Sequence, residues 1–177
     1  HPEVDASSQF YHNKADREKY LEMGFGSVLS HIDDGIFRGT GLLTILNNNR
    51  ENEDLLIDQA ATFYSFNKGS SNQRYPSSLM GSIALIKQAL LDAEWHENTQ
   101  ETTDLSLKKY NETKYLPKIF EVKSPLDYSR LFNISDEFEI DYIVKGTGKE
   151  FLKIKGIKKT NFPIIAPINF PKDYDVS

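Results

Sequence analysis

The chain contains no cysteine among its 177 residues. A disulfide framework, a thiol nucleophile and a cysteine-based zinc site are therefore excluded. It also lacks an apolar run of about 18 residues, the length typical of a membrane-spanning helix, so no membrane partner is expected. The formal net charge is −5. Because phosphate backbones bind basic surfaces, we expect no nucleic-acid partner either.

The composition is sufficient for a hydrophobic core. Hydrophobic residues make up 38% of the chain and aromatic residues 12%, which suits one domain or a large piece of one. The sequence begins at His1 rather than at a methionine, and its end at Ser177 follows no recognisable helix or strand. We therefore expect residues 1–177 to be an interior segment of a longer protein, without a signal peptide in the part given.

The first third of the chain predicts a helix and three strands. Asn13 is a suitable N-cap for a helix over 14–23, and Gly24 is a suitable stop. The polar turn 47–54 separates two of the strands, which predicts a β-hairpin over about 35–66 inserted beside the main fold. The first strand should be short and buried. The expected strands span 25–32, 36–46 and 55–66.

A long apolar helix is predicted after the polar segment 66–75. Pro76 followed by serine marks its start. Its apolar residues repeat with the 3.6-residue period of one helix face and widen that face on both sides, so we expect the helix to be buried on most sides. They are Leu79, Ile83, Ile86 and Leu90, with Met80, Ala84, Leu91 and Trp95. A second helix is expected over 103–114.

The last sixty residues alternate apolar strands with helices. Ser124 and Pro125 resemble a helix start, with serine as cap and proline at the first position. Continuously apolar strands separated by helices are typical of parallel strands covered on both faces. The predicted class is therefore α/β, with parallel βαβ units. The strands are expected at 118–122, 140–146 and 163–168, and the helices at 124–137 and 149–159.

Candidate functional residues follow from this arrangement, because parallel sheets carry their chemistry at the carboxyl ends of the strands. Glu121 and Lys145 stand at equivalent ends of neighbouring strands and are the candidate catalytic residues. A structural ion pair between them is the more conservative interpretation, since ion pairs often mimic active sites. Asn169, after the last strand, is a candidate substrate-binding residue.

The polar loop before the long helix has two equally weighted interpretations. It contains Lys68, Ser70, Ser71, Gln73 and Arg74. These side chains could hold an anionic or amide-bearing ligand, with Lys68 and Arg74 as substrate-binding residues. Alternatively, they could supply the caps and hydrogen bonds that fix the hairpin to the rest of the fold.

Two further motifs are weaker. His31 and Asp33 form an H-x-D motif after the first strand. The two side chains could bind one metal ion together, but a solvent-exposed loop without a metal is the favoured interpretation. Segment 144–151 has the glycines and lysine of a phosphate loop, although Ile143 replaces the first glycine and Glu150 replaces the Ser or Thr that binds magnesium. A tight turn between strand and helix is favoured there, with a weak phosphate site as the alternative.

A set of segments resembles the imidazolonepropionase-related amidohydrolases, in a divergent branch of long bacterial proteins. The resemblance covers nearly the whole chain, and its motifs are specific as a set rather than singly. The segments are YPSSLMGSIALIKQALLDAEW (75–95), LPKIFEVKSPLDYSRLF (116–132), IDYIVKGTGKEFLKI (140–154) and FPIIAPINFPKDYDV (162–176), supported by DDGIFRGTGLLTIL (33–46) and FYSFNKGSSNQ (63–73).

The resemblance implies part of a (β/α)8 TIM-like barrel and metal-dependent hydrolysis of a non-peptide C–N bond, with zinc or another divalent ion activating water. It also implies a small-molecule substrate and a periplasmic or secreted location. The family's H-x-H is absent, and Glu121 and Lys145 stand where many relatives place metal-binding histidines. No metal ligand is therefore assigned here, and the cofactor stays open.

Two functional hypotheses result from this resemblance. The first is a segment of an amidohydrolase-like hydrolase, with a degenerate, non-catalytic copy as its variant. The second is a non-catalytic binding or assembly module. A partial barrel leaves strand edges and apolar surface uncovered, so self-association or contact with the rest of the parent chain is also expected.

Overall fold

The computed structural model describes residues 2–11, 13–47, 54–99 and 104–168. The chain divides into two compact units, residues 1–117 and residues 118–177. The first unit contains an antiparallel sheet, and the second contains a parallel one. This mixed α/β architecture agrees with the predicted class. A single barrel domain over 1–177 stays a prediction.

The sheet of the first unit has three strands in chain order. They are β1 (Ser27–Ser30), β2 (Phe37–Ile45) and β3 (Leu55–Ser65). Both pairings are antiparallel, with Leu29 opposite Leu43 in one and Thr40 opposite Thr62 in the other. The three predicted strands are therefore present. Their insertion into a barrel as a hairpin stays a prediction.

The burial of these strands differs from the expectation for β1. Strand β2 is buried from Phe37 to Leu42, whereas in β1 Ser27 and Leu29 are exposed. The prediction of a buried first strand was wrong, because β1 pairs only with β2 among the described strands and has too few apolar residues to bury both faces.

The amino-terminal segment packs against β2 at a glycine. A short 3-10 helix, η1 (Ala6–Gln9), follows this segment. The Thr40 N–H donates to the Val4 carbonyl at 3.0 Å. Gly39 has a φ of +72°, and a Cβ at this position would lie 1.9 Å from that carbonyl oxygen. Only glycine allows this close approach of the two backbones.

Three helices complete the first unit: α1 (Lys14–Glu22), α2 (Leu79–Thr99) and α3 (Leu105–Thr113). The predicted cap of α1 is confirmed, since Asn13 Oδ1 accepts from the Ala15 N–H at 3.1 Å, and Gly24 has a φ of +90°. Asp104 caps α3 in the same way, accepting from the Ser106 N–H at 2.8 Å. Both caps satisfy backbone donors that helix starts leave unpaired.

Helix α2 is less buried than its sequence predicts. Met80 is 73% exposed and Trp95 is 49% exposed, and Ala84 and Leu91 are exposed between them. The buried side chains of the helix are Ser82, Ile86, Leu90 and Ala93. The expectation of burial on most sides was wrong, because the buried residues form one narrow stripe, completed by the small residues Ser82 and Ala93, while the apolar residues beside it stay exposed.

Among the described residues, none of the helices combines the length and the hydropathy that a membrane span requires.

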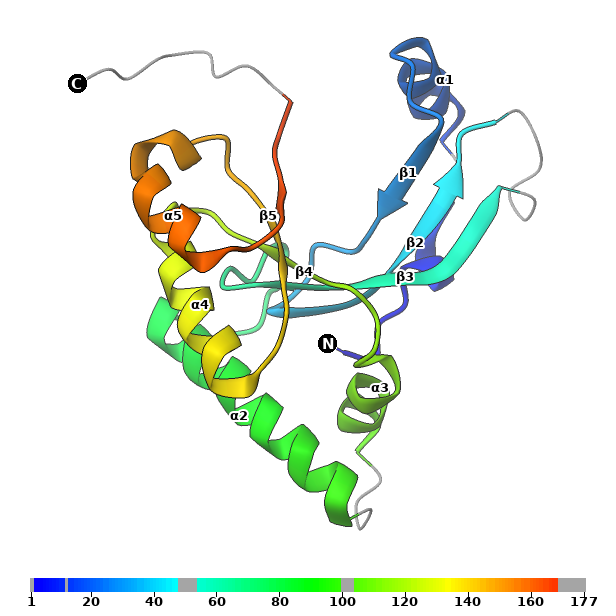
Figure 1. The fold of residues 1–177 in the computed structure, drawn as a ribbon. Helices are drawn as coiled ribbons and strands as arrows, with labels where there is room; N and C mark the ends of the chain where they lie inside the picture. Colours follow the sequence, from blue (N-terminus) through cyan, green and yellow to red (C-terminus); the bar gives the residue numbers. More distant parts are fainter. Residues whose placement is uncertain (1, 12, 48–53, 100–103, 169–177) are drawn as a thin grey trace. The chain divides into compact units, whose positions relative to one another are not determined.

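The second unit confirms the predicted parallel strands. Strands β4 (Lys118–Glu121), β5 (Ile143–Lys145) and β6 (Ile164–Ile165) pair in that order, all in parallel. Phe120 and Val144, which are register partners, are fully buried. The strands β5 and β6 are shorter than the apolar runs that predicted them. Figure 1 shows the strand-helix alternation of this unit.

The helices of the second unit are α4 (Asp127–Phe138), the 3-10 helix η3 (Glu150–Lys153) and α5 (Ile154–Thr160). Helix α4 buries Tyr128, Leu131 and Ile134. Its first residue is Asp127, two residues after the predicted Ser124-Pro125 start. The Ser124 hydroxyl nevertheless accepts from the Leu126 N–H at 3.3 Å, as the predicted cap requires, and the Asp127 carboxylate accepts from the Ser124 N–H at 3.0 Å.

Candidate functional site

The carboxyl ends of β4 and β5 bring the predicted residues Glu121 and Lys145 together. The two are register partners in the parallel sheet, and Lys145 Nζ donates to Glu121 Oε2 at 2.9 Å. Lys123 Nζ contacts the other carboxylate oxygen, Oε1. The Glu121 side chain is only 11% exposed, while both lysine side chains are about half-exposed. The predicted pairing across the sheet is therefore present.

This cluster combines one carboxylate with two ammonium groups. Its formal charge is positive, because a single glutamate faces Lys123 and Lys145. Partial burial of Glu121 strengthens each ion pair, since the carboxylate is removed from most of the solvent. Both lysines keep N–H donors beyond those in the ion pairs, because an ammonium group has three. The cluster can therefore donate hydrogen bonds to a polar small molecule while a carboxylate acceptor stands beside them.

The divalent metal implied by the resemblance does not fit the donors of this region. Within the described ranges, no group of three or more His, Cys, Asp or Glu side chains could hold a metal ion. At Glu121, an ammonium group already faces each carboxylate oxygen. A cation would have to displace a lysine to bind there, so we assign no catalytic step to a metal.

The loop after β5 is closed by its own glutamate. Glu150 Oε1 accepts from the Thr147 N–H at 2.6 Å, from the Thr147 hydroxyl at 3.1 Å and from the Tyr128 hydroxyl at 3.1 Å. Partial burial opposes ionisation, but these hydrogen bonds outweigh it and hold the pKa of Glu150 below its ordinary value. Burial, with the Glu150 charge beside it, raises the pKa of the Tyr128 phenol. The carboxylate thus satisfies the Thr147 N–H and hydroxyl in the loop between β5 and η3.

The polar loop before α2 is fastened to the segment after β1 by a buried arginine. Arg38 has a fully buried side chain, and its Nη2 lies 2.6 Å from Asp33 Oδ1. The same nitrogen donates to the Asn67 carbonyl at 3.3 Å. Backbone bonds add to this link: the Gly35 N–H donates to the Lys68 carbonyl, and the Ser70 N–H donates to the Asp33 carbonyl, each at 2.8 Å. The structural interpretation of the loop therefore has direct support.

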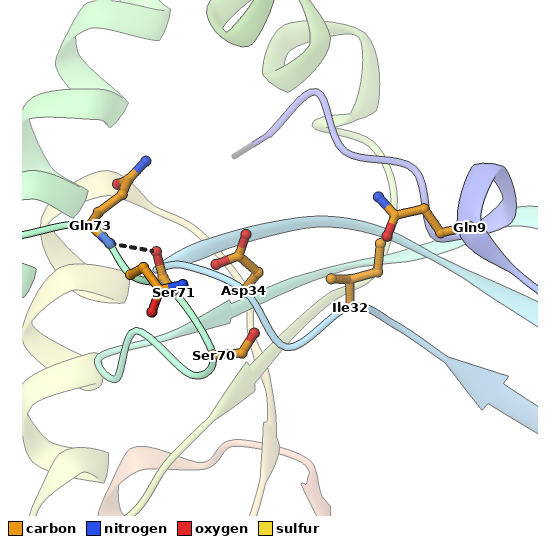
Figure 2. Close-up of a pocket in the computed structure, with 7 residues that line it drawn as sticks. Gln9, Ile32, Asp34, Ser70, Ser71 and Gln73 are labelled. Carbon is orange, nitrogen blue, oxygen red and sulfur yellow. Dashed lines mark hydrogen bonds between the residues drawn. The ribbon is translucent and has the colours of Figure 1, made fainter.

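The same loop lines an open polar depression of about 630 Å³. Figure 2 shows Ser70, Ser71 and Gln73 on one side, Asp34 between the segments, and Gln9 with Ile32 on the other side. The Gln73 N–H donates to Ser71 Oγ at 3.4 Å, which bends the loop. Hydroxyl, amide and carboxylate groups meet here, and Asp34 is the charged residue of the lining, so the depression is suited to a polar molecule that donates hydrogen bonds.

The H-x-D motif is used for packing and for the arginine link. The His31 ring stacks on Phe63 with centroids 4.0 Å apart and an interplanar angle of 16°. His31 Nδ1 lies 3.2 Å from the Ile32 carbonyl oxygen, and Asp33 faces Arg38. The two residues of the motif therefore have separate partners, in agreement with the favoured interpretation of a loop rather than a metal site.

The structure describes two of the three predicted substrate-binding residues. Lys68 Nζ donates to the Gln73 carbonyl at 2.6 Å, and Arg74 is exposed in the same loop. Asn169 lies outside the described residues. A substrate-binding role for these three residues stays a prediction.

Sequence reasoning missed Arg38 and the Tyr128–Glu150 pair. Arg38 lies within an apolar strand pattern, and an arginine flanked by buried positions signals an internal ion pair, since buried charges are almost always paired. Glu150 was noted only as a departure from a phosphate loop. The signal was its place three residues after Thr147 at the start of a helix, where a glutamate reaches back to backbone N–H groups.

Comparison with known proteins gives one kind of match. No protein-family model and no curated protein matches the chain. Among solved structures, the chain is similar to an amidohydrolase from Thermotoga maritima MSB8, with a TM-score of 0.80 and 16% sequence identity. The match covers 98% of this chain and 50% of that one. At this identity the likeness concerns the fold alone: the chain has an amidohydrolase-like fold and spans half the length of that structure.

Proposed function

We propose that this chain is a segment of an amidohydrolase-like hydrolase acting on non-peptide C–N bonds, in which Glu121 and Lys145 contact the substrate. The observation that carries the proposal is the 2.9 Å contact between Lys145 Nζ and Glu121 Oε2 at the carboxyl ends of paired parallel strands. Ligands of parallel α/β sheets bind at these ends. A kinship with the imidazolonepropionase-related branch belongs to the same proposal.

The chemistry of the cluster suits an amide or imide group. An amide presents a carbonyl acceptor beside an N–H donor. An imide presents an N–H donor between two carbonyl acceptors. Lys145 and Lys123 supply donors, and Glu121 supplies an acceptor. Hydrogen bonds to charged groups contribute about 1.5–3 kcal/mol each, so one correctly placed ammonium is sufficient to orient a carbonyl. These residues bind and orient the substrate, and the proposal assigns them no proton transfer.

The test is hydrolysis and binding with matched variants. A panel of cyclic amides, cyclic imides and open-chain amides is offered to the protein, and the carboxylic acid formed by C–N cleavage is quantified by liquid chromatography. Binding of the same compounds is followed by thermal stabilisation. We expect Glu121→Gln and Lys145→Met each to weaken binding or turnover by about tenfold. Lys155→Met, at an exposed position of α5, is the control and should behave as the wild type.

The proposal fails if the two variants match the wild type for every compound that binds. The variants should remain folded, because glutamine at position 121 keeps an acceptor of similar size, and in Lys145→Met the Glu121 carboxylate keeps its contact with Lys123. Circular dichroism and the melting temperature check this directly. A loss of binding together with a large loss of stability in Lys145→Met would count against a role in substrate contact.

A second candidate, a non-catalytic binding or assembly module, is favoured by one observation. The described ranges hold no group of three or more residues able to bind a metal. Turnover of the panel, measured with and without added zinc, separates the two candidates. Stoichiometric zinc that disappears in Glu121→Gln or His31→Ala would support metal-dependent hydrolysis. Protein that retains no zinc, together with full stability and no turnover of the panel, would support the module.

A further inference from the structure

A second cavity lies within the first unit, apart from the polar depression. It has a volume of about 240 Å³ and lies between the start of β2, the loop before α2, and helices α2 and α3. Apolar side chains form most of its wall: Ile36, Phe37, Leu85, Ala89 and Leu107. Its charged group is Lys68, which belongs to the loop together with Ser71 and Gln73.

The size of this cavity suits a small organic molecule. An engineered apolar cavity of about 150 Å³ binds benzene and stays dry without it. A volume of about 240 Å³ therefore accepts one ring with a short substituent. Tyr75, which is 56% exposed, also lines the cavity. This wall reaches the surface and provides an entrance.

Lys68 sets the charge of the occupant. Its Nζ donates one hydrogen bond, at 2.6 Å, to the Gln73 carbonyl, which fixes the ammonium over the loop. An ammonium group has two further N–H donors, and it attracts an anion more strongly when apolar walls exclude water. Among the residues that line the cavity, Lys68 is the charged one. Ser106, another lining residue, donates its hydroxyl to the Glu3 carboxylate at 2.7 Å, so the positive charge is local to Lys68.

We propose that this cavity binds an amphipathic carboxylate, with an aromatic or branched apolar body between Phe37, Leu85 and Leu107 and its carboxylate on Lys68. The site lies wholly within residues 1–117. It uses neither Glu121 nor Lys145, so it is independent of the proposed hydrolase function. It assigns to the loop before α2 a ligand-binding role in addition to its structural one.

The test uses para-trifluoromethylbenzoate as the probe and the whole chain as the protein. Fluorine NMR line broadening gives the affinity. We expect binding to the wild type, and Lys68→Met should weaken it about tenfold, the contribution of one hydrogen bond between charged groups. The neutral para-trifluoromethylbenzyl alcohol should bind wild type and Lys68→Met equally. The cationic para-trifluoromethylbenzylamine should bind more weakly than the benzoate.

Filling variants locate the probe. Ala89→Phe and Leu85→Trp place a ring in the cavity and should each abolish binding. Ala84→Phe adds the same ring to the exposed face of α2 and should leave binding unchanged. If one filling variant does not fold by circular dichroism, the other gives the result. Absence of binding to the wild type, unchanged binding in a folded filling variant, or tighter binding of the amine than of the benzoate would overturn the proposal.

Discussion

Removal of the Asp33 carboxylate should weaken the first unit more than removal of its neighbour Asp34. The Arg38 guanidinium is fully buried and lies 2.6 Å from Asp33 Oδ1. Two of its hydrogen bonds, to the Gly35 and Asn67 carbonyls, are 3.3 Å long and neutralise no charge. In Asp33→Ala the buried guanidinium loses this carboxylate, whereas in Asp34→Ala it keeps it.

The magnitude follows from this geometry. Removing one partner of a buried ion pair costs about 3–5 kcal/mol, because a buried charge is left uncompensated. Asp33 itself is about half-exposed, so water can reach the guanidinium in the variant, and the cost should fall to about 2 kcal/mol. Asp33→Asn keeps an acceptor without the charge and should lose about half as much.

The assay is urea unfolding followed by the fluorescence of Trp95, which is the single tryptophan and lies in the first unit. Hydrogen exchange gives a second readout. The amides of Gly35 and Ser70 bond to carbonyls across the same link, and both should exchange faster in Asp33→Ala. Equal stability of Asp33→Ala and Asp34→Ala, with unchanged exchange at both amides, would refute the reasoning.

Three further predictions concern other parts of the chain. The pKa of Glu150 is lowered on folding, so its contribution to stability is present above the unfolded pKa of about 4.3 and is lost as the pH falls through the folded value. In Glu150→Gln the free energy of unfolding should therefore fall less steeply with decreasing pH in the acid range, and an unchanged pH dependence would contradict this. Burial raises the pKa of Tyr110 to about 12, and burial together with Tyr110 raises that of Tyr64. Both phenols should stay protonated at pH about 11, with stability falling as the pH rises above the unfolded value of about 10, and a tyrosinate absorbance titration in which all nine tyrosines ionise near pH 10 in the folded state would contradict this. Gly39→Ala should destabilise the first unit by about 2 kcal/mol or more in urea unfolding, because its Cβ would collide with the Val4 carbonyl, whereas Gly26→Ala, which meets nothing within 4 Å, should change it little.

The sequence predicts the parallel strands of the second unit well, because their signal is local. In the runs 118–122 and 140–146 the central apolar residues are consecutive rather than alternating, and this pattern is typical of a strand covered on both faces. The same reasoning correctly put Glu121 opposite Lys145. Each residue's distance from the end of its own strand can be counted along the sequence. For two parallel neighbouring strands, that count places Glu121 and Lys145 at the same end of the sheet, so this part of the candidate site can be predicted from the amino-acid sequence.

The rest depends on packing that one-dimensional patterns do not contain. An apolar stripe on α2 predicts burial, but Trp95 and Met80 remain exposed because burial needs a neighbouring surface as well as an apolar side chain. In the sequence, Arg38 is only a charged residue within an apolar strand. Its contact with Asp33 depends on the turn before β2, which the sequence pattern does not indicate. The apolar cavity beside Lys68 is built from five separate segments, so no single segment indicates it.

Cysteine cross-linking between β4 and β5 tests the central claim most directly, that parallel pairing brings Glu121 and Lys145 to one edge. The chain has no cysteine of its own, so any disulfide in a double variant is the designed one. Neighbouring strands lie about 4.8 Å apart, within the range that a disulfide bridges. The account predicts that E121C/K145C cross-links on mild oxidation and that I119C/K145C, the pair that antiparallel strands would bring together, does not. Cross-linking of I119C/K145C without cross-linking of E121C/K145C would contradict it.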